Sequence, residues 1–324
     1  MNQPTSAEGK PLVESNSKPK FRVRSSAASK RAQAFVVTGL VFCSLVSLFT
    51  TIGIIVMLVF ESWGFFADER INLREFLTGT KWTMGQSQGS LSFGIWPLLS
   101  GTLRITGIAM LIALPMGLIT AVYLSEYASK RVRSILKPTL EVLAGIPTVV
   151  LGFFAVKFIT PYMLIPLGDF KTFNATSAGI AVGILCLPLV TSLAEDALQA
   201  VPNRLREGAY GLGSTRLEVT LKVVVPAALS GIISAFLLAL ARAIGETMVV
   251  ALAAGSTPTF TIDPRMPSQT MTGFIVETFK SESVVPGTLP YFSIYAVAAV
   301  LFLITFGITL VGQIIRMRYR EVYD

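Results

Sequence analysis

The sequence predicts an all-α, polytopic membrane protein with six transmembrane helices. Of its 324 residues, 52% are hydrophobic and only 14% are charged, a balance too apolar for an ordinary soluble domain. Six apolar stretches also come near the length of roughly 20 residues that a bilayer requires. The formal net charge of +8 is small for this length, so the distribution of charge is more informative than its sum.

Residues 1–33 are polar and rich in serine, lysine and arginine. Such a composition cannot bury enough apolar surface to fold, so we expect a disordered, basic, cytoplasmic tail that can contact anionic lipid. Residues 34–98 contain the first span and an outer segment whose tryptophans suggest helices or turns in the membrane interface. No small-residue cleavage site ends the first apolar run, so a cleaved signal peptide is not expected.

The spans are predicted to include bent or broken helices. Pro115, Pro147 and Pro188 each lie inside an apolar run, and a break of this kind often lines a cavity or a moving interface. An ordinary membrane-helix proline explains them equally well. The six spans are placed at 34–60, 99–125, 136–160, 176–199, 227–254 and 290–315.

Basic residues set the predicted orientation of these spans. Those of the tail and of 130–137, 204–222 and 316–320 all fall on one side of the membrane, and the opposite loops carry few. Because cytoplasmic loops are enriched in lysine and arginine, both termini and residues 200–226 are expected to be cytoplasmic.

The fifth span contains two charged residues, Arg242 and Glu246, at the spacing that places them on one helix face. An arginine at the bilayer centre costs roughly 2.5–3.5 kcal/mol on insertion scales, and its planar fork suits a tetrahedral oxyanion. The hypothesis is that Arg242 meets an anionic substrate and Glu246 holds it; the alternative is a structural ion pair. Thr148 and Ser192 could also line a polar path, although hydroxyls in spans often only satisfy the backbone.

Several kinds of chemistry are not expected. The chain has no histidine, and Cys43 and Cys186 fall singly within apolar runs, so no metal or redox site is predicted. It also lacks the glycine-rich loop with lysine that holds ATP phosphates. We therefore expect no cofactor, no ATP hydrolysis by this chain and no enzymatic activity.

Residues 200–226 form a polar segment between two long apolar runs. Residues 203–210 can form a short helix, which Gly211 and Gly213 can end because glycine accepts left-handed backbone. Thr215 is followed three residues later by a glutamate, which is capping-box spacing. Two short helices joined by a tight glycine turn are therefore predicted.

The spacing of this segment resembles the EAA loop of ABC importer permeases. The match comprises Glu207-Gly208-Ala209, then Gly213, then Val223-x-Val225-Pro226; Gly208 replaces an alanine, and the two valines replace isoleucine and leucine. In that family the loop docks into a separate cytoplasmic ATPase, whereas a generic helical hairpin is the plainer explanation. The residues expected to couple to the ATPase are Arg206, Glu207, Gly208, Ala209, Tyr210, Gly211, Gly213 and Arg216.

Three further stretches, 124–127, 143–154 and 241–248, resemble the phosphate-specific permeases of the PstC family. The resemblance implies a type I ABC importer permease in the bacterial inner membrane, with a core permease domain at 99–324 and a coupling loop at 200–226. It also implies that Arg242 and Glu246 serve phosphate passage. The implied partners are a PstA-like second permease, two copies of a PstB-like ATPase, a PstS-like periplasmic phosphate-binding protein, membrane lipid and phosphate, but no nucleic acid.

Other functions stay open at this point. The chain could be the PstA-like half, or a permease for another oxyanion such as sulfate or molybdate. An anion channel or a secondary transporter working without ATP belongs to another class, and it leaves the spacing within 207–226 unexplained.

Overall fold

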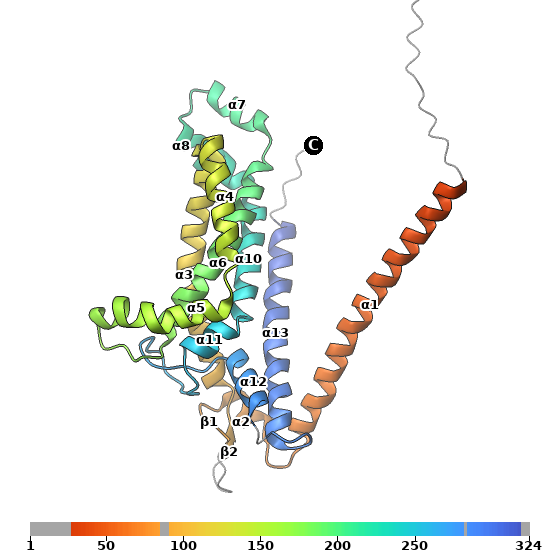
Figure 1. The fold of residues 1–324 in the computed structure, drawn as a ribbon, viewed down its shortest axis with the longest axis vertical. Helices are drawn as coiled ribbons and strands as arrows, with labels where there is room; N and C mark the ends of the chain where they lie inside the picture. Colours follow the sequence, from red (N-terminus) through yellow and green to blue (C-terminus); the bar gives the residue numbers. More distant parts are fainter. Residues whose placement is uncertain (1–26, 85–90, 282–283, 319–324) are drawn as a thin grey trace, which may run out of the picture. The chain divides into compact units, whose positions relative to one another are not determined.

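The computed structural model describes residues 27–84, 91–281 and 284–318, and most of them are helical (Figure 1). The chain divides into two compact units, Met1–Ile55 and Val56–Asp324. In its described part, the first unit is the beginning of α1 (Ala27–Phe66), an apolar helix long enough to cross a membrane. The helix begins before residue 34, so the end of the predicted disordered tail is helical; residues 1–26 lie outside the described residues.

The second unit is built around two helices, α3 (Trp96–Val122) and α6 (Ala175–Gln199), which pack along much of their length. Small residues allow the close approach. A Cβ on Gly117 would lie 2.6 Å from the side chain of Val190, and one on Gly179 would lie 2.7 Å from a side chain of α3. The apolar core of the unit surrounds this pair.

Two more long helices complete this arrangement. α10 (Leu229–Ile244) packs on both α3 and α6, and α13 (Leu289–Arg318) packs on α10. Five of the described helices are long and apolar enough to cross a membrane, and a bent pair, Arg216–Ala227 with Leu229–Ile244, makes a sixth if it is counted as one span. This agrees with the six spans that the sequence predicts.

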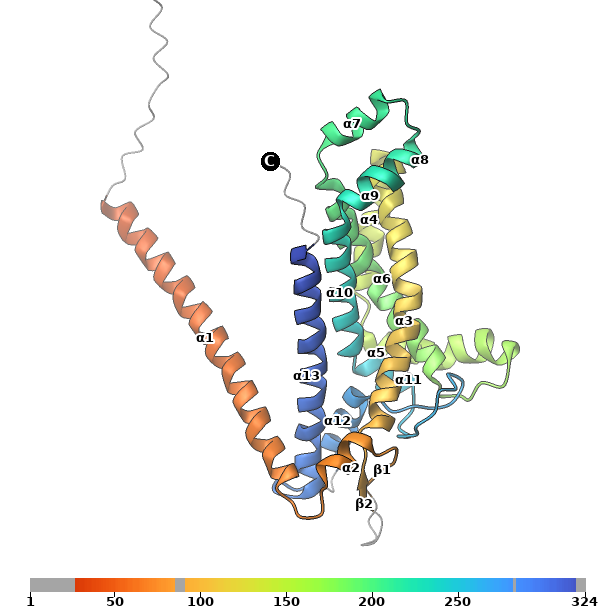
Figure 2. The same ribbon diagram turned by 180° about the vertical axis from the view of Figure 1, so that it is seen from behind.

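The predicted third span, 136–160, is not one helix. α4 (Lys130–Ala144) ends at Gly145, and α5 (Thr148–Phe154) starts a new direction that η2 (Ala155–Leu164) continues. Figures 1 and 2 show α5 lying across the direction of α3 and α6. Pro147 accounts for the break, since proline disfavours helical backbone in the preceding residue and provides no N–H.

The predicted fifth span, 227–254, is also interrupted. α10 ends at Ile244 with Gly245 as its C-terminal cap, and α11 (Met248–Ala253) begins after a short irregular stretch. Arg242 therefore lies in the last turn of a helix, and Glu246 lies outside that helix. The expectation that the two share one helix face is wrong.

One end of the second unit departs from the all-α prediction. There β1 (Trp82–Met84) and β2 (Leu91–Phe93) pair antiparallel, with Trp82 opposite Phe93. Aromatic rings from α1, from α2 (Leu73–Thr78) and from α12 (Met271–Lys280) pack edge-on against the hairpin. The remaining elements are η1 (Tyr123–Tyr127), η3 (Ile165–Leu167), α7 (Asn203–Gly211), α8 (Arg216–Val219), η4 (Thr220–Val224) and α9 (Val225–Ala227).

Candidate functional site

The two short helices predicted within residues 200–226 are present as α7 and α8, at the end of the unit opposite the β-hairpin (Figures 1 and 2). The turn between them places Gly213 at a φ of 85°, a left-handed conformation that favours glycine. Thr215 and Glu218 form the predicted capping box, in which the Thr215 N–H donates to the Glu218 carboxylate at 3.0 Å. The local structure of this segment was therefore correctly predicted.

The tip of this segment exposes both polar and apolar side chains. Glu207 and Gly208 are exposed on α7, and Tyr210 is 44% exposed. Leu212 is 89% exposed at the turn, which is unusual for a leucine unless another surface covers it. Sequence reasoning missed Leu212, although its place between two glycines of the motif was a usable signal. Gly211 and Gly213 are also exposed, and Ala209 is half-buried.

Arg206 does not belong to the exposed surface. Its guanidinium pairs with the Glu126 carboxylate of η1 at 3.0 Å and donates to the carbonyl of Leu198, at the end of α6, at 2.8 Å. It also donates to the carbonyl of Val201. Glu126 is only 8% exposed. Arg206 therefore joins α7 to the ends of both central helices.

Arg216 reaches the same turn from the other side. Its guanidinium donates to the Glu126 carbonyl and lies over the Tyr127 ring, 4.8 Å from the ring centre. The η1 turn is thus held between the two helices of the segment. Sequence reasoning missed Glu126 as a partner; the only signal was that residues 124–127 belong to a stretch resembling the PstC family.

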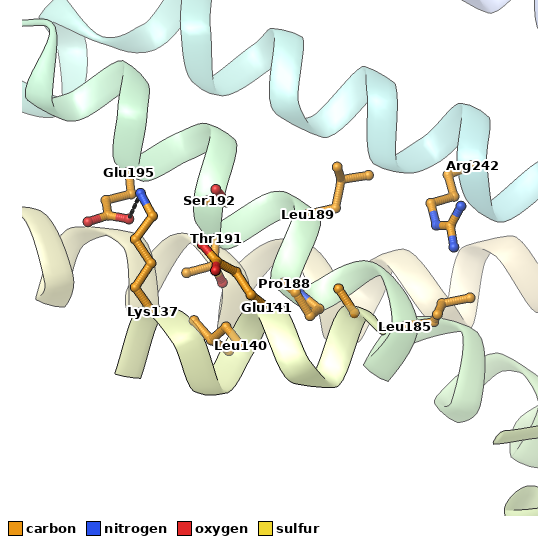
Figure 3. A pocket seen from close by; sticks show the side chains of 11 residues that line it. Lys137, Leu140, Glu141, Leu185, Pro188, Leu189, Thr191, Ser192, Glu195 and Arg242 are labelled. Carbon is orange, nitrogen blue, oxygen red and sulfur yellow. Dashed lines mark ion pairs between the residues drawn. The ribbon is translucent and has the colours of Figure 1, made fainter. Parts of the chain in front are cut away.

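A pocket of about 380 Å³ opens between α4, α6 and α10. Figure 3 shows Lys137 and Glu195 at one end of it and Arg242 at the other. The pocket combines apolar walls with a few charged and hydroxyl groups, as ligand sites commonly do. Its lining comprises Lys137, Leu140, Glu141, Ala144, Leu185, Pro188, Leu189, Thr191, Ser192, Glu195 and Arg242.

Arg242 is exposed in this pocket and has no ion-pair partner among the described residues. Glu246 is 8% exposed and forms hydrogen bonds with other residues. Its carboxylate accepts from the Val249 N–H at 3.3 Å, at the start of α11, and its carbonyl accepts from the Thr272 hydroxyl at 2.8 Å. The expected contact between Glu246 and Arg242 is therefore absent from the described part of the chain.

The two predicted hydroxyl residues fall in different places. Ser192 lines the pocket on α6, three residues before Glu195. Thr148 is half-buried at the start of α5 and does not line it. The interruption at Gly145 to Pro147 is the reason, because it turns Thr148 away from the direction of α4.

Glu195 is the most deeply buried charge at the pocket. It is 0% exposed, and its carboxylate pairs with Arg133 Nε at 2.8 Å and with Lys137 Nζ at 3.2 Å. Both cations come from α4, and the pairing fixes that helix to α6. A burial this complete requires compensation by ion pairs. The sequence analysis did not identify Glu195 as a site residue.

A second arginine fixes the loop after α11. Arg104 of α3 donates to the carbonyls of Thr261 and Asp263 at 2.8 and 2.7 Å. The Arg265 guanidinium hydrogen bonds to the Asp263 carboxylate and holds the pKa of that group below its ordinary value. The Arg104 hydrogen bonds attach this loop to α3.

Comparison with known proteins shows the family of this chain. Residues 113–321 match the family described as "Binding-protein-dependent transport system inner membrane component". The chain belongs to this family. The permease is 32% identical to the probable ABC transporter permease protein YqgH of Bacillus subtilis, over 72% of this chain and 75% of that one. It is 31% identical to the phosphate transport system permease protein PstC of Mesorhizobium japonicum, over 75% and 78% of the two chains.

A related phosphate permease is similar over a shorter range. The phosphate transport system permease protein PstA 1 of Mycobacterium tuberculosis is 36% identical over 52% of this permease and 53% of its own length. The match to the Mesorhizobium japonicum PstC protein confirms the expected resemblance to PstC-type permeases.

Solved structures support the same fold. A chain of a bacterial ABC transporter involved in the import of the acidic polysaccharide alginate superposes with a TM-score of 0.63 and 16% identity, covering 91% of this permease and 99% of that chain. A chain of the MetNI methionine ABC transporter gives a TM-score of 0.53 and 17% identity, covering 70% and 95%. The predicted architecture of an ABC importer permease with several membrane spans is confirmed.

Proposed function

We propose that this permease is one of two membrane subunits of an ATP-driven phosphate importer, and that the pocket between α4, α6 and α10 is part of the phosphate path. The observation that carries the proposal is Arg242, an exposed arginine without an ion-pair partner among the described residues, at the end of a pocket in an apolar bundle. The PstC and PstA relatives supply the substrate class.

The depth of Arg242 makes a purely structural role expensive. It lies in the last turn of α10, about 20 Å along the helix from its start at roughly 1.5 Å per residue. A charge within the hydrocarbon layer costs a few kcal/mol unless water or a partner compensates it. A tetrahedral oxyanion offers oxygens that the planar guanidinium fork can bind in pairs.

The exposed tip formed by Glu207, Gly208, Tyr210 and Leu212 is the proposed contact for an ATPase. Its side of the unit also contains the basic start of α4 and the basic end of α13, so this side and the C-terminus are assigned to the cytoplasm of a bacterial cell. The basic residues of the N-terminal tail assign the N-terminus to the cytoplasm as well. The proposed partners are a PstA-like second permease, two copies of a PstB-like ATPase and a PstS-like phosphate-binding protein. ATP binding would close the ATPases, and α7 would carry that movement to α3 and α6 through Arg206.

Two alternatives also have support: that this chain is the PstA-like half, and that the substrate is another oxyanion. Identity to the PstA 1 protein reaches 36%, although over a shorter range than the PstC matches. A permease of the same architecture for another oxyanion would use the same arginine.

The test is uptake of radiolabelled phosphate into proteoliposomes that contain this permease with its partner permease, ATPase and binding protein. We expect uptake only when ATP is present on the ATPase side, with competition by arsenate and not by sulfate. Uptake without ATP would contradict the importer proposal in favour of a channel or secondary transporter. Sulfate-sensitive uptake would keep the architecture and change the substrate.

A further inference from the structure

We propose that Arg133 and Lys137 of α4 form a second anion-binding site, at the end of the pocket away from Arg242, where phosphate pauses before it leaves the transporter. Glu195 holds both cations in place and keeps its ion pairs when an anion binds beside it. The inference rests on the proposed function and assigns residues that the resemblance does not.

The geometry is that of an anion held by two cations. Glu195 presents one carboxylate oxygen to Arg133 Nε at 2.8 Å and the other to Lys137 Nζ at 3.2 Å. Gln199 adds a hydrogen bond from its side-chain amide at 2.9 Å. A phosphate has the same kind of oxygens, in larger number and with more charge, so it can accept from the N–H groups of both cations that Glu195 does not use.

The two cations are accessible, whereas the carboxylate is not. The Arg133 and Lys137 side chains are 36% and 31% exposed, while that of Glu195 is 1% exposed. Lys137 and Glu195 line the same pocket as Arg242, so an anion that reaches Arg242 has a continuous cavity leading to Lys137 (Figure 3). The cations can donate to a ligand in the pocket while they still compensate the buried Glu195 carboxylate.

The charge balance also favours a transient anion site. Two cations meet one buried carboxylate, and Asp196, which lies 3.4 Å from Lys137, is 61% exposed and screened by solvent. Glu141 lines the pocket between this site and Arg242. The negative charge of Glu141 repels an anion between the two cationic sites. The anion is therefore expected to stop at Arg242 and at Lys137 but not between them.

α4 is loosely attached to the rest of the second unit. None of its residues is buried, and the breaks at its two ends separate it from η1 and α5. Its attachment to α6 includes the Glu195 ion pairs, so an anion that shares these cations weakens the attachment of α4. Release of the substrate and movement of α4 would then be linked.

The experiment uses the complete transporter in proteoliposomes and compares Lys137→Gln with Lys130→Gln. Both variants remove one positive charge from α4, but Lys130 is exposed and has no ion pair among the described residues. Lys137→Gln should lower maximal uptake by about tenfold, the usual effect of losing a charge-assisted hydrogen bond. The external phosphate concentration giving half-maximal uptake should not change. Lys137→Arg should restore uptake, and Lys130→Gln should resemble the wild type.

A double variant in which both partners are uncharged distinguishes a substrate-binding site from a contact that is only structural. In Lys137→Gln with Glu195→Gln, two amides can still hydrogen bond across α4 and α6, so the helices stay joined. Slow uptake by this assembled double variant would support the site, and uptake restored to the wild-type rate would overturn it. Glu195→Gln alone frees both cations, so phosphate inside the vesicles should inhibit uptake at about tenfold lower concentration.

The outcomes also distinguish this inference from the proposed function. If the wild-type complex imports phosphate with ATP and Lys137→Gln imports it equally fast, only the second site is overturned. If the wild-type complex imports no phosphate, the proposed function fails and this inference fails with it.

Discussion

Arg206 illustrates what a single buried side chain does in this molecule. It is 15% exposed, pairs with a nearly buried glutamate and donates to carbonyls at the end of α6. Lys222 also has an ion pair, to Glu218 at 3.4 Å, but both of its members are exposed. Buried pairs are costly to break because one charge is left without compensation, whereas exposed pairs contribute about 0–1 kcal/mol.

The matched pair Arg206→Gln and Lys222→Gln tests this difference. We expect Arg206→Gln to destabilise the protein by about 2–3 kcal/mol and to raise the number of ATP molecules hydrolysed per phosphate imported. Lys222→Gln should change both quantities little. Thermal unfolding and paired hydrolysis and uptake measurements check this, and equal effects of the two variants would contradict the role given to Arg206.

At the scale of single elements, the α7–α8 turn followed from local rules. Of two helix breaks, the sequence indicated the one at Pro147 as a possibility and did not indicate the one at Gly245. The glycines and the Thr215 cap determine backbone geometry within a few residues, so the sequence predicted them. The breaks at Gly145 to Pro147 and at Gly245 to Thr247 lie inside apolar runs. Hydropathy indicates which residues lie in lipid but not the direction of each helix. The helices on either side of each break were therefore predicted as one span.

Two glycines of this segment should respond oppositely to alanine. Gly213 has a φ of 85°, so Gly213→Ala should cost about 1 kcal/mol or more and weaken ATPase binding. Gly208 lies within α7, where nothing stands within 4 Å of an added Cβ. Gly208→Ala should therefore stabilise the helix by up to about 1 kcal/mol. Co-purification of the ATPase measures both, and detachment by Gly208→Ala alone would contradict the assignment.

The exposed tip of the segment should recognise the ATPase. Glu207→Lys reverses a charge on the surface of α7, and Glu207 has no hydrogen bond or ion pair to lose among the described residues. We expect the ATPase to dissociate more readily, while this permease and its partner permease still assemble. Unchanged ATPase co-purification and unchanged coupled hydrolysis would show that the docking surface lies elsewhere.

At the scale of the whole second unit, the contact between α3 and α6 organises the other helices. Gly179→Leu would place side-chain atoms where Ile108 already stands, since even a Cβ would lie 2.7 Å from Ile108 Cβ. Overpacking of this kind costs about 1–3 kcal/mol. Gly107 of α3 has nothing within 4 Å of an added Cβ, so Gly107→Leu is the control. A lowered unfolding temperature is expected for Gly179→Leu only.

The tertiary partners of charged residues were the least predictable part of the molecule. The sequence identified Arg242 because a charge inside an apolar run is conspicuous, but it paired that residue with Glu246 by helical spacing. The break at Gly245 removes that spacing, and Glu246 caps α11 instead. Glu126 and Glu195 meet arginines and lysines far away in the chain, and no local pattern indicates such contacts.

Phosphate uptake by a complex carrying Arg242→Gln, measured together with ATP hydrolysis, tests the central claim most directly. Removing the cation should slow uptake about tenfold to a hundredfold, as expected for losing charged hydrogen bonds to the anion. The complex should still assemble and hydrolyse ATP, because Arg242 lies apart from the α7–α8 contact. Uptake at the wild-type rate in this variant would contradict the claim that Arg242 lies on the phosphate path.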